Sequence, residues 1–260
     1  MNFTLGIDFR FMKKNKILAA CVHLYTASGL VIALVAAMAL KNHHIELFLS
    51  SLWLAVIVDS TDGVLARHYR VKQVLPSFSG RRLDDITDYI TYVFLPVVGM
   101  IEFEVLPGSL WGIAVFPLLA SGYGFCQDIA KTEESFVGFP SYWNILFIYF
   151  YLLQVPVCWV VMLLMFCSVF VFVPIRYIYP SRTQWLQKTT LALSFVYGLL
   201  MAFICVFAQH NWVQPVVWMS LFYPVYYIVV SLLHHVRIMK SGNEAIETDG
   251  KSEMALTGGP

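Results

Sequence analysis

Residues 58–92 read VDSTDGVLARHYRVKQVLPSFSGRRLDDITDYITY and place acidic side chains on two successive apolar segments. Asp59 and Asp62 lie near the end of one apolar run, and Asp84 and Asp88 begin the next run after a polar loop. In a helix, side chains three or four positions apart share one face, so each pair of carboxylates points the same way. Two antiparallel neighbouring helices can therefore bring all four carboxylates to a common point.

The rest of the chain has the composition of a helical membrane protein. Of its 260 residues, 59% are apolar and 13% are charged, whereas an ordinary soluble domain has roughly 25% charged residues. Apolar runs of about 18 or more residues recur, and each is long enough to cross the hydrocarbon core of a bilayer. We therefore predict an all-α, polytopic membrane protein. The net charge of +1 gives no indication of a nucleic-acid partner.

The hydrophobic pattern predicts about eight transmembrane helices. The long apolar stretch after Asn144 is divided at Gln154-Val155-Pro156, because one straight helix of that length would exceed the bilayer. With both termini in the cytoplasm, all but Lys41 of the 17 Lys and Arg residues lie on the inner side, as the positive-inside rule requires. We expect a cytoplasmic N-terminal segment (1–16), a transmembrane catalytic domain (17–240) and a disordered C-terminal tail (241–260). The expected helices cover 17–40, 46–67, 84–105, 109–128, 142–154, 157–178, 188–208 and 213–237.

Four carboxylates that face one another near a membrane need compensating charge. One Asp at mid-membrane costs about 2.5–3.5 kcal/mol by insertion scales, and four together would also repel one another. A pair of divalent cations removes both problems, and oxygen ligands without His or Cys favour Mg²⁺ or Mn²⁺ over zinc. We therefore predict two Mg²⁺ or Mn²⁺ ions held by Asp59, Asp62, Asp84 and Asp88, with open positions for phosphate oxygens.

These acidic residues allow two other interpretations. In the first, Asp59 and Asp62 merely end a span in solvent, and Gly63 and Ala66 are helix-packing residues. This explains only part of the set. A cation transporter also carries intramembrane acids. Here, however, the acids gather at one membrane surface, and no paired broken helices occupy corresponding halves of the chain. The pattern therefore favours an enzyme.

The same residues match a known motif. The pattern D-x2-D-G-x2-A-R followed by G-x3-D-x3-D resembles that of the CDP-alcohol phosphotransferase family, whose fold we then expect. The spacer between the two halves has twelve residues here, from His68 to Ser79, whereas most of the family has about eight. The longer spacer is similar to that of the bacterial phosphatidylcholine synthase branch, as are HLYTASG (23–29), GFPSYWN (138–144) and FVPIRYIYPSRT (172–183). All the defined motif positions are present: Asp59, Asp62, Gly63, Ala66, Arg67, Gly80, Asp84 and Asp88.

The resemblance implies a role for each motif residue. Asp59, Asp62 and Asp84 would bind the CDP diphosphate through the metal ions. Asp88 would complete the second metal site and act as the general base on the incoming hydroxyl group. The remaining motif residues would shape the pocket for CDP-diacylglycerol: Gly63, Ala66, Arg67 and Gly80. Two residues of the first expected helix, Thr26 and Ser28, are weaker candidates for the same role.

The resemblance also implies the reaction and its place. The phosphatidyl group of CDP-diacylglycerol would pass to choline, with release of CMP, at the cytoplasmic face of a bacterial inner membrane. Serine, inositol phosphate or glycerol phosphate remain alternative acceptors, because Arg81 and Arg82 lie beside the carboxylates and would suit an anion. A homodimer is compatible with the sequence.

Choline carries a quaternary ammonium group, which proteins bind with aromatic faces and nearby carboxylates. The candidate acceptor-binding aromatics on the expected cytoplasmic side are Tyr89, Tyr142, Trp143 and Tyr177. Asp85 stands outside the motif, and we expect it to pair with Arg81 or Arg82. Two further arginines, at and just after the end of the sixth expected helix, are candidates for binding the lipid phosphate: Arg176 and Arg182.

Overall fold

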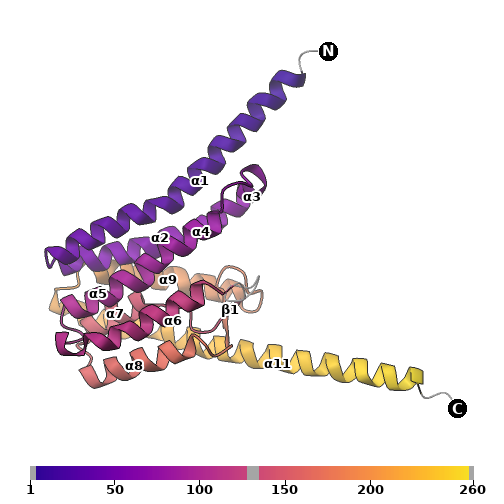
Figure 1. Ribbon diagram of the computed structural model, residues 1–260. Helices are drawn as coiled ribbons and strands as arrows, with labels where there is room; N and C mark the ends of the chain where they lie inside the picture. The colour runs from indigo at the N-terminus through magenta and orange to yellow at the C-terminus, as the bar shows by residue number, and fades with distance from the viewer. Residues whose placement is uncertain (1–3, 128–134, 258–260) are drawn as a thin grey trace.

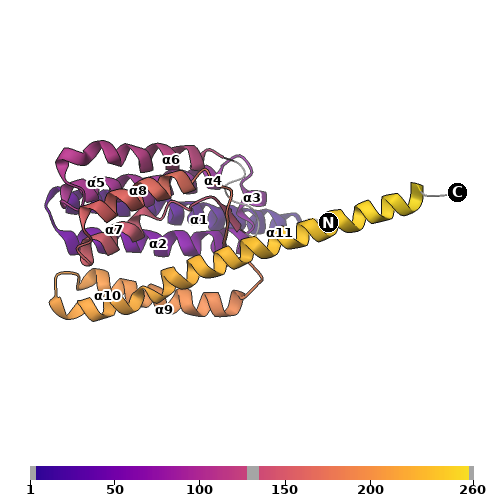
Figure 2. The same cartoon turned by 90° about the horizontal axis from the view of Figure 1, so that it is seen from below.

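The protein is a helical bundle with one small sheet. The computed structural model describes residues 4–127 and 135–257, with side chains described for 15–127 and 135–240. Helices α1 and α11 extend beyond the rest of the bundle at the same end (Figures 1 and 2). The elements of the first half are α1 (Thr4–Lys41), α2 (Ile45–His68), α3 (Val71–Val74), α4 (Gly80–Asp88), the π-helix η1 (Tyr89–Phe94), α5 (Leu95–Glu102), the 3₁₀ helix η2 (Gly108–Ala114) and α6 (Val115–Phe125). Those of the second half are β1 (Ser135–Val137), α7 (Trp143–Leu152), α8 (Val157–Phe170), β2 (Arg176–Ile178), α9 (Gln187–Val206), the 3₁₀ helix η4 (Asn211–Val213), α10 (Gln214–Ser220) and α11 (Phe222–Thr257).

Each expected helix corresponds to a helical run of the structure, and the all-α class is confirmed. The expected helix 84–105 is the continuous run α4–η1–α5, and the expected break between 154 and 157 separates α7 from α8. The expected helix 109–128 ends at Phe125, and residue 128 lies outside the described part of the chain. The last expected helix is interrupted at Leu221, because Pro224 has no N–H to donate to the Ser220 carbonyl.

Several of the helices are long and apolar enough to cross a membrane. Within the described residues, five meet that requirement by length and composition: Asn15–Lys41, Ile45–His68, Gly108–Phe125, Gln187–Val206 and Asn211–Lys240. The chain is therefore a multi-pass membrane protein. Helices α7 and α8 are shorter, and the ten residues of α7 rise only about 15 Å. The total of eight complete crossings accordingly stays a prediction.

The sixth expected helix, 157–178, is wrong in its last part. Helix α8 ends at Phe170, because Pro174 disfavours helical backbone at Val173 and cannot continue a helix. Residues 176–178 form strand β2 instead, which pairs antiparallel with β1 so that Phe136 lies opposite Tyr177. Neither strand was predicted. The short sheet places the start of the 176–182 segment against α11.

The ends of the chain continue as helix where polar segments were expected. Helix α1 already begins at Thr4, inside the expected N-terminal segment 1–16. Helix α11 runs on to Thr257 through most of the segment expected to be a disordered tail. That part contains Ala, Glu, Lys and Met residues, which favour helix, and no proline before the chain's last residue. The division of the chain into terminal segments and a catalytic domain stays a prediction.

The packing of α1, α2 and α4 positions the acidic residues. Helix α1 lies along α2 and also contacts α4, as Figure 1 shows. On the far side of α2, the fully buried rings of Phe48 and Phe147 pack edge to face, with centroids 5.6 Å apart. This apolar core keeps α2, α5 and α7 together. Helix α2 thus has fixed neighbours on both sides, and the carboxylates at its end are held in place.

Candidate active site

A pocket opens between α1, α2 and the α4–η1 run, and all four predicted carboxylates line it. Asp59 and Asp62 come from α2, whereas Asp84 and Asp88 come from α4. Helix α1 contributes Thr26 to the wall. The other lining residues are small or apolar: Gly29, Ala55, Val58, Thr87 and Thr91. The predicted convergence of the two acidic pairs is therefore present in the fold.

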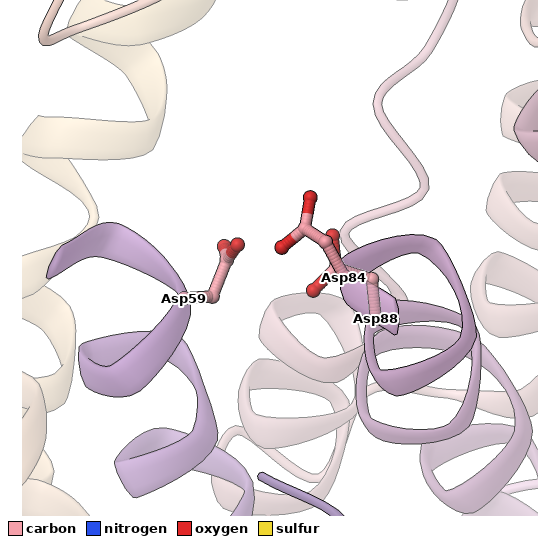
Figure 3. Close-up of side chains that lie close together, drawn as sticks. All are labelled: Asp59, Asp84 and Asp88. Carbon is pink, nitrogen blue, oxygen red and sulfur yellow. The ribbon is translucent and has the colours of Figure 1, made fainter. Parts of the chain in front are cut away.

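Three of the carboxylates form a compact group. One oxygen atom from each of Asp59, Asp84 and Asp88 lies within 4.8 Å of the others. Figure 3 shows Asp59 pointing across the gap between two helices toward Asp84 and Asp88. Ligands about 2.1 Å from a divalent ion lie up to about 4.2 Å apart across it. The three residues thus fit a divalent metal ion after only small side-chain adjustments, and their all-oxygen chemistry suits Mg²⁺ or Mn²⁺.

Asp62 lies in the same pocket but outside this group of three. Its side chain is buried, with 6% of its surface exposed, and it interacts with the Thr26 hydroxyl and with the charge of Asp84. A buried carboxylate near other carboxylates is unfavourable unless a cation or hydrogen bonds compensate it. Asp62 therefore adds to the negative charge that a cation in this pocket would neutralise.

Local structure explains why α4 begins where it does. Ser79 caps the helix, because its side-chain oxygen accepts a hydrogen bond of 3.3 Å from the Arg82 backbone N–H, the usual way to satisfy a free N-terminal donor. Gly80 begins the helix, and His23 of α1 lies against it. A Cβ at residue 80 would come within 2.9 Å of His23 Cε1. Any side chain at this position would therefore displace the His23 ring.

The helix changes its winding just after the last carboxylate. Residues Tyr89–Phe94 form a π-helix, η1, and Pro96 follows within the first turn of α5. A proline within a helix cannot donate to the carbonyl four residues earlier, here Tyr92, and its ring crowds that carbonyl. The wider turn accommodates this proline, and single π-turns of this kind are frequent at functional sites.

Sequence reasoning missed Tyr92, which contacts the carboxylate group directly. Its hydroxyl donates a hydrogen bond of 2.7 Å to Asp59 Oδ2. Tyr92 follows Asp88 by four residues and so continues the series Gly80, Asp84, Asp88 on the same helix face. That spacing was the available signal.

The four candidate acceptor aromatics occupy two different environments. Tyr142 packs against Tyr92, with ring centroids 6.2 Å apart, and against Tyr227 at 5.9 Å. Tyr177 lies parallel to Tyr227 at 6.3 Å, and burial raises the pKa of Tyr177, so its phenol stays protonated at neutral pH. We call Tyr92, Tyr142, Tyr177 and Tyr227 the tyrosine cluster. It extends from Asp59 toward strand β2.

The other two candidates have structural partners away from the carboxylates. The indole N–H of Trp143 donates a hydrogen bond of 2.7 Å to Ser121 Oγ on α6, and the side chain is fully buried. The Tyr89 hydroxyl donates to the Leu118 carbonyl of α6 at 3.0 Å. Like Tyr142 and Tyr177, neither residue lines the pocket. Both contacts hold α6 against its neighbours.

The basic residues near this end of the bundle do not line the pocket either. Asp85 pairs with Arg81, with Nε and Oδ2 3.8 Å apart, as expected. Arg176 is exposed on β2, where its backbone N–H donates to His235 of α11. The Arg182 guanidinium lies 4.8 Å from the centre of the Tyr179 ring.

Ser28, a weaker candidate for binding CDP-diacylglycerol, has a partner within its own helix. Its hydroxyl donates to the Tyr25 carbonyl at 2.6 Å.

A membrane-embedded helical bundle with carboxylates converging from two neighbouring helices fits a metal-dependent phosphotransferase that acts on a lipid substrate. Residues 19–132, which include the whole pocket wall, match the family model described as CDP-alcohol phosphatidyltransferase. The chain belongs to this family.

Several members of that family that are similar to this chain are phosphatidylcholine synthases. Phosphatidylcholine synthase of Borreliella burgdorferi is 36% identical over 188 residues, which cover 72% of this chain and 80% of that protein. Phosphatidylcholine synthase of Pseudomonas aeruginosa is 36% identical over 70% of this chain and 78% of its own length. That of Legionella pneumophila is 38% identical over 65% of this chain and 67% of its own length.

Proposed function

We propose that this protein transfers the phosphatidyl group of CDP-diacylglycerol to choline, giving phosphatidylcholine and CMP. The observation that carries the proposal is the group of Asp59, Asp84 and Asp88, which suits a divalent ion able to bind a diphosphate. The similarity to phosphatidylcholine synthases over most of the chain favours choline as the acceptor. The protein would act in the bacterial inner membrane, with both termini and the pocket on the cytoplasmic side.

The reaction forms one phosphorus–oxygen bond and breaks another. The choline oxygen attacks the phosphorus that bears the lipid, and the bond from that phosphorus to the CMP oxygen breaks, so that CMP leaves. Asp88 accepts the hydroxyl proton, for which it must lie within hydrogen-bond reach of the choline oxygen. Two bound Mg²⁺ or Mn²⁺ ions would neutralise the phosphate charge and orient the diphosphate for in-line displacement. Asp59, Asp62, Asp84 and Asp88 would hold the two ions.

The pocket offers separate sides for the two substrates. Helix α1 and the motif half of α2 form the side where CDP-diacylglycerol would bind, with Thr26 in the wall. Gly63, Ala66, Arg67 and Gly80 do not line the pocket wall, and they would contact the nucleotide beyond it. Ser28 is the weaker candidate because its hydroxyl donates to the Tyr25 carbonyl of its own helix. The tyrosine cluster lies on the other side, next to Asp59. The cluster does not line the pocket wall itself. Because aromatic faces next to a carboxylate suit a trimethylammonium group, and Tyr92 of the cluster contacts Asp59, Tyr142 and Tyr177 are favoured over Trp143 and Tyr89.

Arg176 and Arg182 keep a separate proposed role. A positively charged side chain near the membrane surface attracts lipid phosphates, and Arg176 is exposed on β2. Because neither arginine lines the pocket, they would bind the phosphate of a membrane lipid at the periphery of the site.

An acceptor-competition assay tests the proposed function. The purified protein in detergent receives CDP-diacylglycerol, Mn²⁺ and one of choline, serine, inositol phosphate or glycerol phosphate. Of the four acceptors, only choline should give a phospholipid product together with CMP. If serine, inositol phosphate or glycerol phosphate gives a product and choline does not, the choline assignment is wrong, but the phosphatidyl transfer remains.

A further inference from the structure

The hydrogen bond between Tyr92 and Asp59 links the two helical runs that supply the carboxylates. Tyr92 lies on η1, immediately after α4, and Asp59 lies on α2. The bond length of 2.7 Å is ordinary for a hydroxyl donor and an oxygen acceptor. The phenol thus fixes the position of one oxygen of Asp59 relative to the helix that carries Asp84 and Asp88.

The Tyr92 ring is itself held rigidly. Only 6% of its surface is exposed, and Tyr142 packs against it at 6.2 Å. The hydroxyl groups of Tyr142 and Tyr227 interact in turn, and the Tyr227 hydroxyl donates to the Ile178 carbonyl of β2 at 3.1 Å. A side chain packed in this way presents its hydroxyl in one place, which is the property required of a group that orients a metal ligand.

We propose that Tyr92 is a positioning residue for the metal site: its hydroxyl orients the Asp59 carboxylate so that the other oxygen faces Asp84 and Asp88. A carboxylate has two oxygens with about four acceptor positions, so Asp59 binds a cation while it accepts the Tyr92 bond. Loss of such an outer hydrogen bond typically weakens metal affinity 10–100-fold. The inference rests on the proposed function only in that both need the same metal site.

The test measures Mn²⁺ affinity directly, in the absence of CDP-diacylglycerol and choline. Purified full-length protein is stripped of metal and titrated with Mn²⁺ while free Mn²⁺ is followed by electron paramagnetic resonance. Tyr92→Phe keeps the ring and removes the hydroxyl, and it should raise the Mn²⁺ dissociation constant about 10–100-fold. Tyr149→Phe is the matched control, because Tyr149 is equally buried at 7% exposure and donates to or accepts from Ser220 instead. Its affinity should stay at the wild-type value.

A double-mutant cycle separates positioning of Asp59 from a general structural effect. In the Asp59→Asn background, Tyr92→Phe should produce little further loss of Mn²⁺ affinity, because the two residues act through one contact. The proposal is overturned if Tyr92→Phe binds Mn²⁺ as tightly as the wild-type protein. It is also overturned if Tyr92→Phe lowers the Mn²⁺ affinity by the same factor in the Asp59→Asn background as in the wild-type background. Thermal unfolding of the metal-free variants checks that they fold, and Tyr92→Leu provides a second chain without the hydroxyl.

The outcome for Tyr92 is distinguishable from the outcome for the proposed function. If Tyr92→Phe weakens Mn²⁺ binding but the wild-type protein makes no phosphatidylcholine, the inference stands and the proposed function fails. If the wild-type protein makes phosphatidylcholine and Tyr92→Phe binds Mn²⁺ normally, only the inference fails. If the proposed function and the role of Tyr92 are both correct, saturating Mn²⁺ should restore most of the turnover of Tyr92→Phe.

Discussion

Gly29 of α1 and Thr87 of α4 approach each other so closely that a Cβ atom at residue 29 would lie 2.5 Å from Thr87 Cγ2. Both residues line the carboxylate pocket, and Thr87 directly precedes Asp88 in the chain. Because Cβ contacts of that length are not tolerated, any side chain at position 29 must move α1 away from α4 or rotate Thr87. The width of the pocket thus depends on this glycine.

Gly29→Ala should therefore lower both activity and stability. Overpacking of this kind typically costs about 1–3 kcal/mol, and we expect turnover with choline to fall about tenfold or more. Adding Thr87→Ser removes the methyl group but keeps the hydroxyl that donates to the Leu83 carbonyl at 2.9 Å, so it should restore most of the loss. Gly198→Ala is the control, since its Cβ would meet nothing within 4 Å. Full activity of Gly29→Ala alone would show that the contact does not matter.

Asp88→Asn tests the proposed general base. An amide neither accepts the choline proton nor carries charge, and loss of a general base usually lowers the rate about 10²–10⁴-fold. CDP-diacylglycerol binding should be partly retained, because Asp59, Asp62 and Asp84 remain. Turnover and lipid-substrate binding are measured separately on the same preparation. Complete loss of binding would make Asp88 mainly a metal ligand, and an active variant would exclude the base role.

Tyr142→Leu tests whether the tyrosine cluster binds choline. A cation–π contact contributes about 0.5–2 kcal/mol, so the KM for choline should rise roughly 2–30-fold while the KM for CDP-diacylglycerol stays the same. Tyr89→Leu serves as the comparison, because the Tyr89 hydroxyl bonds to Leu118 of α6 and not toward the pocket. If the choline KM responds to Tyr89 and not to Tyr142, the acceptor side has been placed wrongly.

Trp143→Phe should affect stability and not choline binding. The substitution removes the 2.7 Å bond to Ser121 and leaves a smaller ring in a fully buried position, which together cost about 1–3 kcal/mol. We expect a lower Tm in detergent and an unchanged KM for choline. An unchanged Tm with a raised KM would instead place Trp143 at the acceptor.

The acidic residues were predictable because helix periodicity alone places Asp59 and Asp62, or Asp84 and Asp88, on one face. The class of fold followed from hydropathy in the same way. Other features depend on contacts between distant segments, which no local pattern reveals. Strands β1 and β2 pair residues about forty positions apart in the chain. The early end of α8, in contrast, follows from Pro174, a local signal that the apolar composition of the segment concealed. Tyr142 and Trp143 are neighbours in the sequence but have different partners. Tyr142 packs against Tyr227 of α11, whereas Trp143 bonds to Ser121 of α6.

The most direct test of the account is metal-dependent formation of phosphatidylcholine by the purified protein. Protein in detergent is stripped of metal with a chelator, then supplied with CDP-diacylglycerol, choline and increasing Mn²⁺, and both products are quantified. We predict no product before Mn²⁺ is added, equal amounts of CMP and phosphatidylcholine afterwards, and no product from a chain with Asp59, Asp84 and Asp88 all changed to Asn. Product formation by the metal-free protein, or by the triple variant, would contradict the assignment of these three carboxylates.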